Sequence, residues 1–326
     1  MRKLLHIAIL GLAALSLSSC LAGKFMSGYA LTPKVHGVDD IARTRAKADS
    51  LMPGSTAWYD ALKAQGILKD QWIVNDEGLK LHACTVSAAD PANAQGTAIV
   101  VHGYGDNHYV FLYLVRMYRD LFNYNVLFPD LQYHGYSEGD EIQMGWKDRL
   151  DVMKWIEVAH DIFKDDFMVL HGVSMGAATV MMTSGEVLPT YVKCFIEDCG
   201  YSSVRDQFKK NLKDMGPIPV DILNSASIVT HKNYGWWFES ADCTKQLAKC
   251  VLPMLFIHGD ADDFVPFEHL QKNYDAKIYG YKEKWVAEGA VHANSFARHT
   301  DEYVSHCRNF LNKVKQMILD GTYPLG

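Results

Sequence analysis

Residues 167–178 read Phe-Met-Val-Leu-His-Gly-Val-Ser-Met-Gly-Ala-Ala. The stretch begins with an apolar run of strand length, continues as Gly-x-Ser-x-Gly and ends in small residues that are typical of a helix start. A sharp strand-to-helix turn would expose the hydroxyl of Ser174 beside free backbone amides, as a serine nucleophile requires. Gly172 and Gly176 suit the turn because a Cβ atom at either place would collide with a neighbouring strand or helix. The pattern is short and recurs by chance, so the nucleophile hypothesis depends on whether the rest of the chain supplies a base and an acid.

The composition indicates a globular protein with a large core. The chain has 326 residues, of which 48% are apolar and 12% aromatic, which suffices for one large domain or two small ones. The formal net charge is −6, so the charge balance gives no support for a nucleic-acid partner.

The first twenty residues are typical of an export signal. Arg2 and Lys3 precede an apolar segment, residues 4–17, that is too short to span a membrane comfortably. The segment ends in Leu17-Ser18-Ser19-Cys20, which resembles the lipobox of bacterial lipoproteins. The resemblance implies that Cys20 is lipidated and anchors an exported protein to a membrane of the bacterial cell envelope, the outer membrane in a Gram-negative cell. The alternative is an ordinary secretory signal cut near the same place.

Six cysteines remain after Cys20, and an exported protein could pair some of them. Their connectivity cannot be deduced from the sequence. Cys243 and Cys250 would lie about 10 Å apart in a helix, beyond disulfide reach. We expect most of the six to be buried free thiols.

The N-terminal part of the mature chain is expected to be peripheral. Residues 21–33 contain Gly23, Gly28 and Pro33 without a clear period and are interpreted as a tether. Helices are expected at 38–52 and 55–65, so residues 21–68 form a tether with N-terminal helices. The main domain is expected to cover residues 69–326, beginning with a hairpin at a sheet edge around the turn Asn75-Asp76-Glu77-Gly78.

Strands and helices alternate after residue 97. Buried strands are expected at 97–101, 126–128, 167–173, 191–196, 253–257 and 278–286, with helices between them and a closing helix at 298–318. This order predicts an α/β fold with a mostly parallel, doubly wound sheet and helices on both faces. Functional sites in such sheets lie at the carboxyl ends of the strands.

The alternation is interrupted at about residues 202–246. We interpret this insertion as a small helical cap over the site, and the alternative is an ordinary helix pair with core aromatics. Under the cap interpretation, five aromatic residues are candidates for a substrate pocket: Tyr201, Phe208, Trp236, Trp237 and Phe238.

The chain supplies both an acid and a base downstream of Ser174. The segment 258–266 reads His-Gly-Asp-Ala-Asp-Asp-Phe-Val-Pro, and His292 follows the last expected strand. The order Ser, Asp, His resembles that of the α/β-hydrolase superfamily, over roughly residues 72–311. The resemblance implies that Asp262 is the acid, because Gly259 and Val265-Pro266 match the family's Gly-x-x-Asp-x-x-Val-Pro loop. Asp263 and Asp198 are the rival acids.

A fourth motif, His102-Gly103-Tyr104-Gly105, is similar to the family's oxyanion loop. The resemblance implies that the backbone N–H groups of Tyr104 and Met175 hold the oxyanion. His171 and His258 are interpreted as packing or turn residues, and Asp130 and His134 as hydrogen-bonded loop supports. No zinc-type spacing or phosphate loop occurs, so no metal or cofactor is implied.

The sequence thus predicts a serine hydrolase that cleaves a small carboxylic ester or thioester through an acyl-enzyme. A serine peptidase or amidase is the alternative on the same fold. A non-catalytic surface-binding lipoprotein is a third possibility, because fold alone does not imply activity. The oligomeric state is left open.

Overall fold

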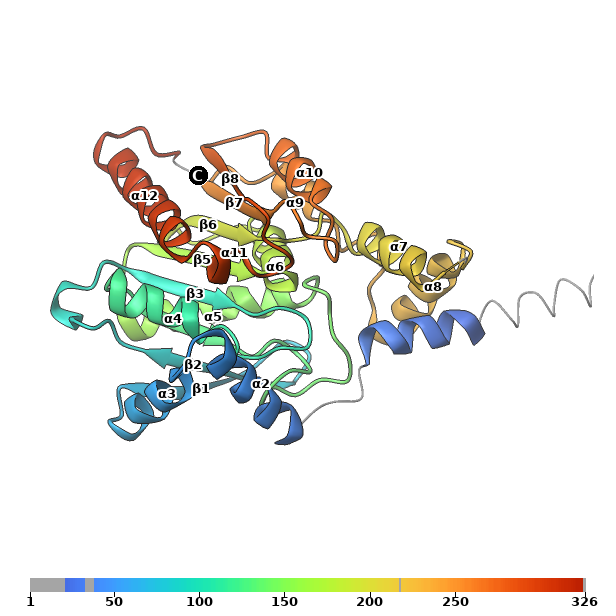
Figure 1. Cartoon of the computed structure of the whole chain (residues 1–326), viewed down its shortest axis with the longest axis horizontal. Helices are drawn as coiled ribbons and strands as arrows, with labels where there is room; N and C mark the ends of the chain where they lie inside the picture. Colours follow the sequence, from blue (N-terminus) through green and yellow to red (C-terminus); the bar gives the residue numbers. More distant parts are fainter. Residues whose placement is uncertain (1–20, 33–37, 217, 325–326) are drawn as a thin grey trace, which may run out of the picture.

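An eight-stranded sheet runs through the protein, whose computed structural model describes residues 21–32, 38–216 and 218–324 (Figure 1). The strand order is β1-β2-β4-β3-β5-β6-β7-β8, antiparallel at β1–β2 and β2–β4 and parallel elsewhere. The predicted fold class, a mostly parallel α/β-hydrolase sheet, is therefore confirmed. The strands are β1 Leu68–Val74, β2 Lys80–Val86, β3 Thr97–Val101, β4 Asn125–Pro129, β5 Met168–Val173, β6 Val192–Asp198, β7 Met254–Gly259 and β8 Lys282–Ala287.

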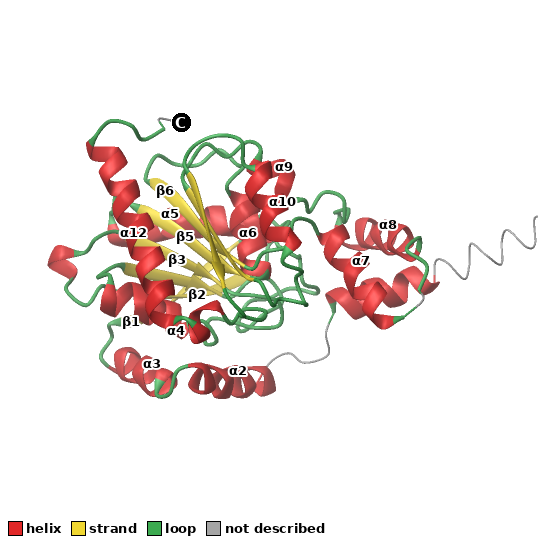
Figure 2. Cartoon of the chain, turned by 45° about the horizontal axis from the view of Figure 1, so that its top comes forward, coloured by secondary structure: helices red, strands yellow, loops and turns green. Residues whose placement is uncertain are grey.

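Helices cover both faces of this sheet because its central strands are apolar on both sides. Every residue of β3, β4 and β5 is buried. One core cluster joins the sheet to α5, α6, α9 and α10, and the other joins it to α3, α4 and α12; Figure 2 shows α4 and α12 together on one side. The helices are α2 Val38–Leu51, α3 Ser55–Ala64, α4 Leu112–Arg116, α5 Asp148–Phe163, α6 Met175–Thr183, α7 Val204–Met215, α8 Ile222–Tyr234, α9 Cys243–Leu247, α10 Glu268–Ala276, α11 Ser295–Arg298 and α12 Thr300–Leu319.

The strand order places a crevice beside the Gly-x-Ser-x-Gly turn. The chain passes from β3 outward to β4 and then returns to β5 on the other side of β3. The loops that follow β3 and β5 therefore diverge, which opens the crevice where α/β sheets bind ligands. The loops after β7 and β8, with the expected acid and base, end at the same edge.

A helical lobe extends from this edge of the sheet (Figures 1 and 2). It consists of residues 21–31, which were expected to be a tether, and of the segment 204–238 with α7 and α8. Residues 21–31 are helical and lie against α7 and α8, so the tether prediction is wrong for this stretch. Gly23 allows the close approach, because a Cβ atom there would lie 2.7 Å from the carbonyl carbon of Ser225. Ser27 Oγ and Thr230 Oγ1 are 3.0 Å apart, and Met26 and Leu31 are buried. Tertiary packing thus overrides the low helix propensity of the glycines.

The remaining differences from the expected elements are small. The last strand begins at Lys282 instead of residue 278, because the chain bends at Tyr279 and Gly280, where Gly280 has a φ of 69°. The closing helix begins at Thr300, after the separate short helix α11. The expected signal peptide and Cys20 lie outside the described residues. Within those residues, the six cysteines are free and buried, and none of the helices has the length and apolar character needed to cross a bilayer.

Candidate active site

Ser174 occupies a strained turn between β5 and α6. Its backbone has φ 58° and ψ −119°, a conformation that residues with a side chain rarely adopt. The flanking glycines make the turn possible. A Cβ atom on Gly172 would lie 2.1 Å from the carbonyl oxygen of Gly176, and one on Gly176 would lie 2.1 Å from that of Val101. The turn therefore holds the hydroxyl at the crevice, as the sequence predicted.

The structure brings Ser174, His292 and Asp262 together from three separate loops. Ser174 Oγ lies 2.9 Å from His292 Nε2, and His292 Nδ1 lies 2.8 Å from Asp262 Oδ2. With Nδ1 protonated and donating to the carboxylate, Nε2 is free to accept the serine proton. The hydroxyl, imidazole and carboxylate form a continuous hydrogen-bonded chain.

The Asp262 carboxylate is held in its charged form. Burial would raise its pKa, but hydrogen bonds from His258 and His292 outweigh burial and lower it well below the usual range. Its other oxygen, Oδ1, accepts from the backbone amides of Phe264 and Val265 at 3.0 and 2.9 Å. The loop thus presents a fixed anion to the imidazole.

Neither rival acid takes this position. Asp198 ends β6 and accepts a 3.0 Å hydrogen bond from the Tyr303 hydroxyl, while burial raises its pKa to about 6. Asp263 is exposed. In the part of the chain that the structure describes, the carboxylate hydrogen-bonded to His292 is that of Asp262.

The loop after β3 lies directly beside Ser174. A Cβ atom on Gly103 would lie 3.3 Å from both Ser174 Cβ and the Val173 carbonyl oxygen, so a larger residue here would press against the turn that carries the hydroxyl. Tyr104 follows on this loop, and Met175 is the first residue of α6. Among the described residues, neither backbone amide donates to a protein acceptor, so both remain available to an oxyanion.

Two histidines fix the conformation of this loop. His102 Nδ1 lies 2.8 Å from the Gly103 carbonyl oxygen, while its Nε2 accepts from the Leu131 amide at 2.9 Å. His134 Nε2 accepts from the Gly105 amide at 3.1 Å. Burial lowers the pKa of His102, which keeps the ring neutral in this arrangement. The expected supporting role of His134 agrees with this geometry.

Asp130 organises a second, fully buried cluster that the sequence only partly indicated. Its carboxylate lies 2.8 Å from His82 Nδ1 and 2.8 Å from His108 Nδ1, and it accepts from the Tyr136 amide at 3.0 Å. Burial would raise the pKa of Asp130, but the two histidines lower it well below its usual value. The three groups lie close enough to share a metal ion, yet their contacts are ordinary hydrogen bonds that brace the loop after β4.

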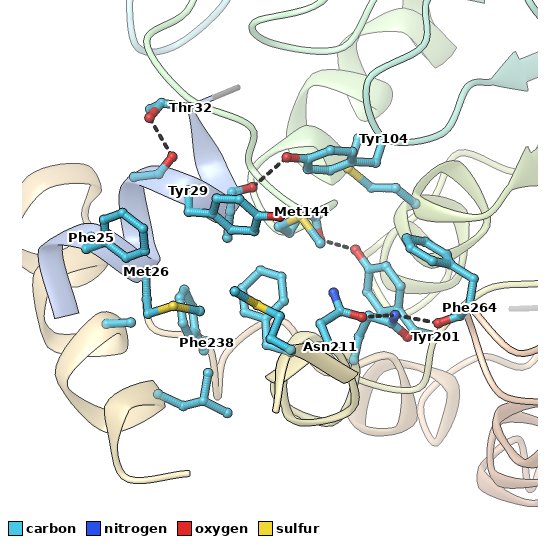
Figure 3. Close-up of a pocket in the computed structure, with 18 of the residues that line it drawn as sticks. Phe25, Met26, Tyr29, Thr32, Tyr104, Met144, Tyr201, Asn211, Phe238 and Phe264 are labelled. Carbon is cyan, nitrogen blue, oxygen red and sulfur yellow. Dashed lines mark hydrogen bonds between the residues drawn. The ribbon is translucent and has the colours of Figure 1, made fainter. Parts of the chain in front are cut away.

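A pocket of about 850 Å³ opens from Ser174 into the helical lobe (Figure 3). Three of the five aromatic residues predicted to line it do so: Tyr201, Phe208 and Phe238. The prediction is wrong for the two tryptophans. Trp236 is buried in the lobe's core, and Trp237 is 40% exposed and stacks on His231 with ring centroids 3.9 Å apart. Successive residues of this irregular turn face different sides, so the aromatic run cannot form a single wall.

The opposite wall of the pocket comes from the N-terminal helix, which sequence reasoning missed. Seven residues of this segment line the pocket: Lys24, Phe25, Met26, Gly28, Tyr29, Ala30 and Thr32. Figure 3 shows the Met26 side chain next to Phe238, while the Tyr29 ring lies beside Met144. The signal was present in the sequence, because Leu21, Phe25 and Tyr29 are spaced by four residues, as on one helix face.

The sequence matches one protein family and two bacterial relatives. The sequence model of the prolyl oligopeptidase family, Peptidase_S9, matches residues 131–317. The chain belongs to this family. Two bacterial relatives share 26% identity with this family member: YqkD of Bacillus subtilis over 69% of this chain and 73% of its own length, and YfhR of Escherichia coli O157:H7 over the same shares. Both relatives are named as uncharacterized proteins.

Solved structures share the fold of this prolyl oligopeptidase family member. Esterase Pf2001 of Pyrococcus furiosus aligns with a TM-score of 0.61 and 22% identity, over 77% of this chain and 93% of its own. A membrane phospholipase A, described as a bacterial virulence factor, aligns with a TM-score of 0.55 and 15% identity over 96% of this chain and 99% of its own. The acylaminoacyl peptidase of Pyrococcus horikoshii aligns with a TM-score of 0.57 and 14% identity, but over only 43% of its length. These structures show the α/β-hydrolase fold, and the family match makes the protein a hydrolase on that fold.

Proposed function

We propose that the protein is a serine hydrolase that cleaves carboxylic esters with an apolar acyl group. The supporting observation is the hydrogen-bonded chain of Ser174, His292 and Asp262 at the base of the apolar pocket. In the proposed reaction, His292 Nε2 accepts the Ser174 proton while Oγ attacks the ester carbonyl. The amides of Tyr104 and Met175 hold the tetrahedral oxyanion. His292 then protonates the leaving alcohol, and a water activated by His292 releases the acid.

The lining of the pocket favours esters over peptides. Among the described residues that line it, Lys24 alone carries a full charge, and the remainder are mostly apolar. A peptidase needs polar partners for the substrate backbone and its termini, because a buried polar group without a hydrogen bond is costly. Thioesters would use the same machinery. The family name and the acylaminoacyl peptidase neighbour keep amide hydrolysis as the second candidate.

Matched substrates separate these two candidates. We expect p-nitrophenyl esters to be hydrolysed with kcat/KM rising from acetyl to octanoyl, and N-acyl aminoacyl p-nitroanilides to be poor substrates. Ser174→Ala is the control for uncatalysed hydrolysis in both series. Faster turnover of the anilides than of the matched esters would contradict the ester assignment and support a peptidase.

We also propose that Cys20 is the lipidated first residue of the mature protein, attached to the bacterial cell envelope. The order Leu17-Ser18-Ser19-Cys20 after an apolar segment supports this. Two or more acyl chains anchor stably, whereas one binds only marginally. Mass spectrometry of the N-terminal peptide should find a diacylglyceryl group on Cys20. A free amino group on a later residue would contradict the proposal.

A further inference from the structure

The helical lobe carries an unusual number of exposed apolar side chains. We define the lobe as residues 21–31 together with residues 204–238, which include α7 and α8. Leu21, Phe25 and Tyr29 are 71%, 67% and 63% exposed and follow one face of the N-terminal helix. Four more exposed apolar residues lie in the other part of the lobe, residues 204–238: Met215, Val220, Ile228 and Trp237. Such a concentration on one projecting part of a protein is typical of an interaction surface.

The same helix forms both this surface and the wall of the pocket. Phe25 and Tyr29 are exposed, yet they also line the pocket, so they stand at its rim (Figure 3). On the inner side Met26 is buried, and Ser27 bonds to Thr230 of α8. A partner that binds the exposed face of the N-terminal helix therefore also lies at the entrance of the pocket.

The charge of the lobe is opposite to that of the whole chain. The lobe contains six lysine or arginine residues and three aspartates, whereas the chain has a net charge of −6. Four exposed lysines have no carboxylate within ion-pair distance among the described residues: Lys24, Lys209, Lys213 and Lys232. Exposed apolar residues interspersed with lysines are the pattern of segments that lie in an anionic lipid interface.

We propose that this lobe docks on a lipid surface and that the acyl chain of the substrate enters the pocket from that surface. The proposal rests on the proposed ester hydrolysis and on lipidation at Cys20, which directly precedes the exposed helix in the sequence. A second copy of the chain is a poorer occupant, because two basic lobes would face each other and like charges oppose association. An anionic membrane satisfies both the apolar residues and the lysines.

Fluorescence of Trp237 tests the docking directly. The full-length lipoprotein is reconstituted into phosphatidylcholine–phosphatidylglycerol vesicles whose acyl chains are brominated. Bromine should quench part of the tryptophan emission, and Trp237→Phe should abolish that quenching. Trp72→Phe is the matched control, because Trp72 is 46% exposed on β1 outside the lobe and its loss should leave the quenching intact. Unquenched wild-type emission, or equal quenching in Trp237→Phe, would overturn the proposal, as would cross-linking of the lobe to a second copy.

Turnover tests the entry route. Val220→Glu and Ile228→Glu change exposed residues that do not line the pocket. Each should lower hydrolysis of a long-chain ester embedded in vesicles about tenfold while leaving turnover of dissolved p-nitrophenyl acetate unchanged. Val187→Glu is the control, since Val187 is 94% exposed outside the lobe. An unchanged ratio of vesicle to dissolved turnover would overturn the entry route. A wild type that hydrolyses no ester, with Trp237 quenching intact, would instead refute the proposed function and leave the docking standing.

Discussion

The hydroxyl of Tyr104 donates a 2.9 Å hydrogen bond to the backbone carbonyl of Ala30. The bond joins the loop beside Ser174 to the N-terminal helix that forms the far wall of the pocket. Burial raises the pKa of Tyr104 to about 12, so the hydroxyl stays protonated and remains a donor across the ordinary pH range. The position of the helix is therefore coupled to the loop that carries one of the two proposed oxyanion amides.

Removing this hydroxyl should loosen the helix without moving the loop amide. Tyr104→Phe loses one hydrogen bond, worth about 1 kcal/mol, and leaves an unpaired carbonyl at Ala30. We expect faster amide hydrogen exchange in residues 21–31 and a several-fold lower kcat/KM for octanoyl esters. Exchange rates equal to those of the wild type would show that the contacts with α8, such as Ser27 with Thr230, hold the helix without this bond.

The phenylalanines of the pocket should set the preference for acyl length. Each buried methylene contributes about 0.8 kcal/mol, or roughly fourfold in kcat/KM, until the pocket is full. Phe208 and Phe238 contact each other inside the pocket, with ring centroids 5.0 Å apart. Phe208→Ala and Phe238→Ala should flatten the rise of kcat/KM with chain length. Trp237→Ala, outside the pocket, should keep the wild-type slope, and a loss of slope there would mean that the aromatic run acts as a unit.

The three candidate acids should differ sharply in their effect on turnover. Asp262→Asn replaces the charged partner of His292 and favours the wrong imidazole tautomer, which should lower kcat by about 10⁴-fold. Asp198→Asn and Asp263→Asn change residues that do not contact His292 and should lower it far less. Steady-state kinetics of the three variants decides the matter, and a larger loss at Asp198 would contradict the proposed pairing.

A buried carboxyl outside the site should make stability depend on pH. Burial, aided by the nearby Asp151, raises the pKa of Asp148 to about 8. Because the folded-state pKa is raised, the folded protein holds this proton more tightly than the unfolded chain, and stability is lost as pH rises from about 4 to about 8. Relative to the wild type, Asp148→Asn should therefore gain a few degrees in Tm on going from pH 5 to pH 8.5. A Tm difference that is independent of pH would show that Asp148 is ionised throughout.

The sequence predicted most of what depends on short local patterns. The turn at Ser174, the parallel strands and the loop of Asp262 each rest on residues within a few positions of one another, such as Gly172 and Gly176. The N-terminal helix is instead stabilised by contacts such as that of Ser27 with Thr230, about two hundred residues away in the sequence. It was not predicted because its glycines have a low helix propensity.

The two tryptophans and the Asp130 cluster escaped prediction for related reasons. Trp236 and Trp237 lie in an irregular turn, where no periodicity tells which side each residue faces. His82 and His108 come from a strand and a loop that meet Asp130 only in the folded sheet. Pairings of this kind have no spacing in the sequence that could reveal them.

The central claim, that Ser174 forms the acyl-enzyme, is tested most directly by intact-protein mass spectrometry after reaction with a fluorophosphonate. The wild type should gain a single phosphonyl adduct, with peptide mapping placing it on Ser174, and its ester hydrolysis should cease in parallel. Ser174→Ala should gain none while keeping the wild-type fold, since the glycines and not the hydroxyl permit the turn. An adduct of equal yield on Ser174→Ala, or ester hydrolysis by that variant above the uncatalysed rate, would contradict the assignment.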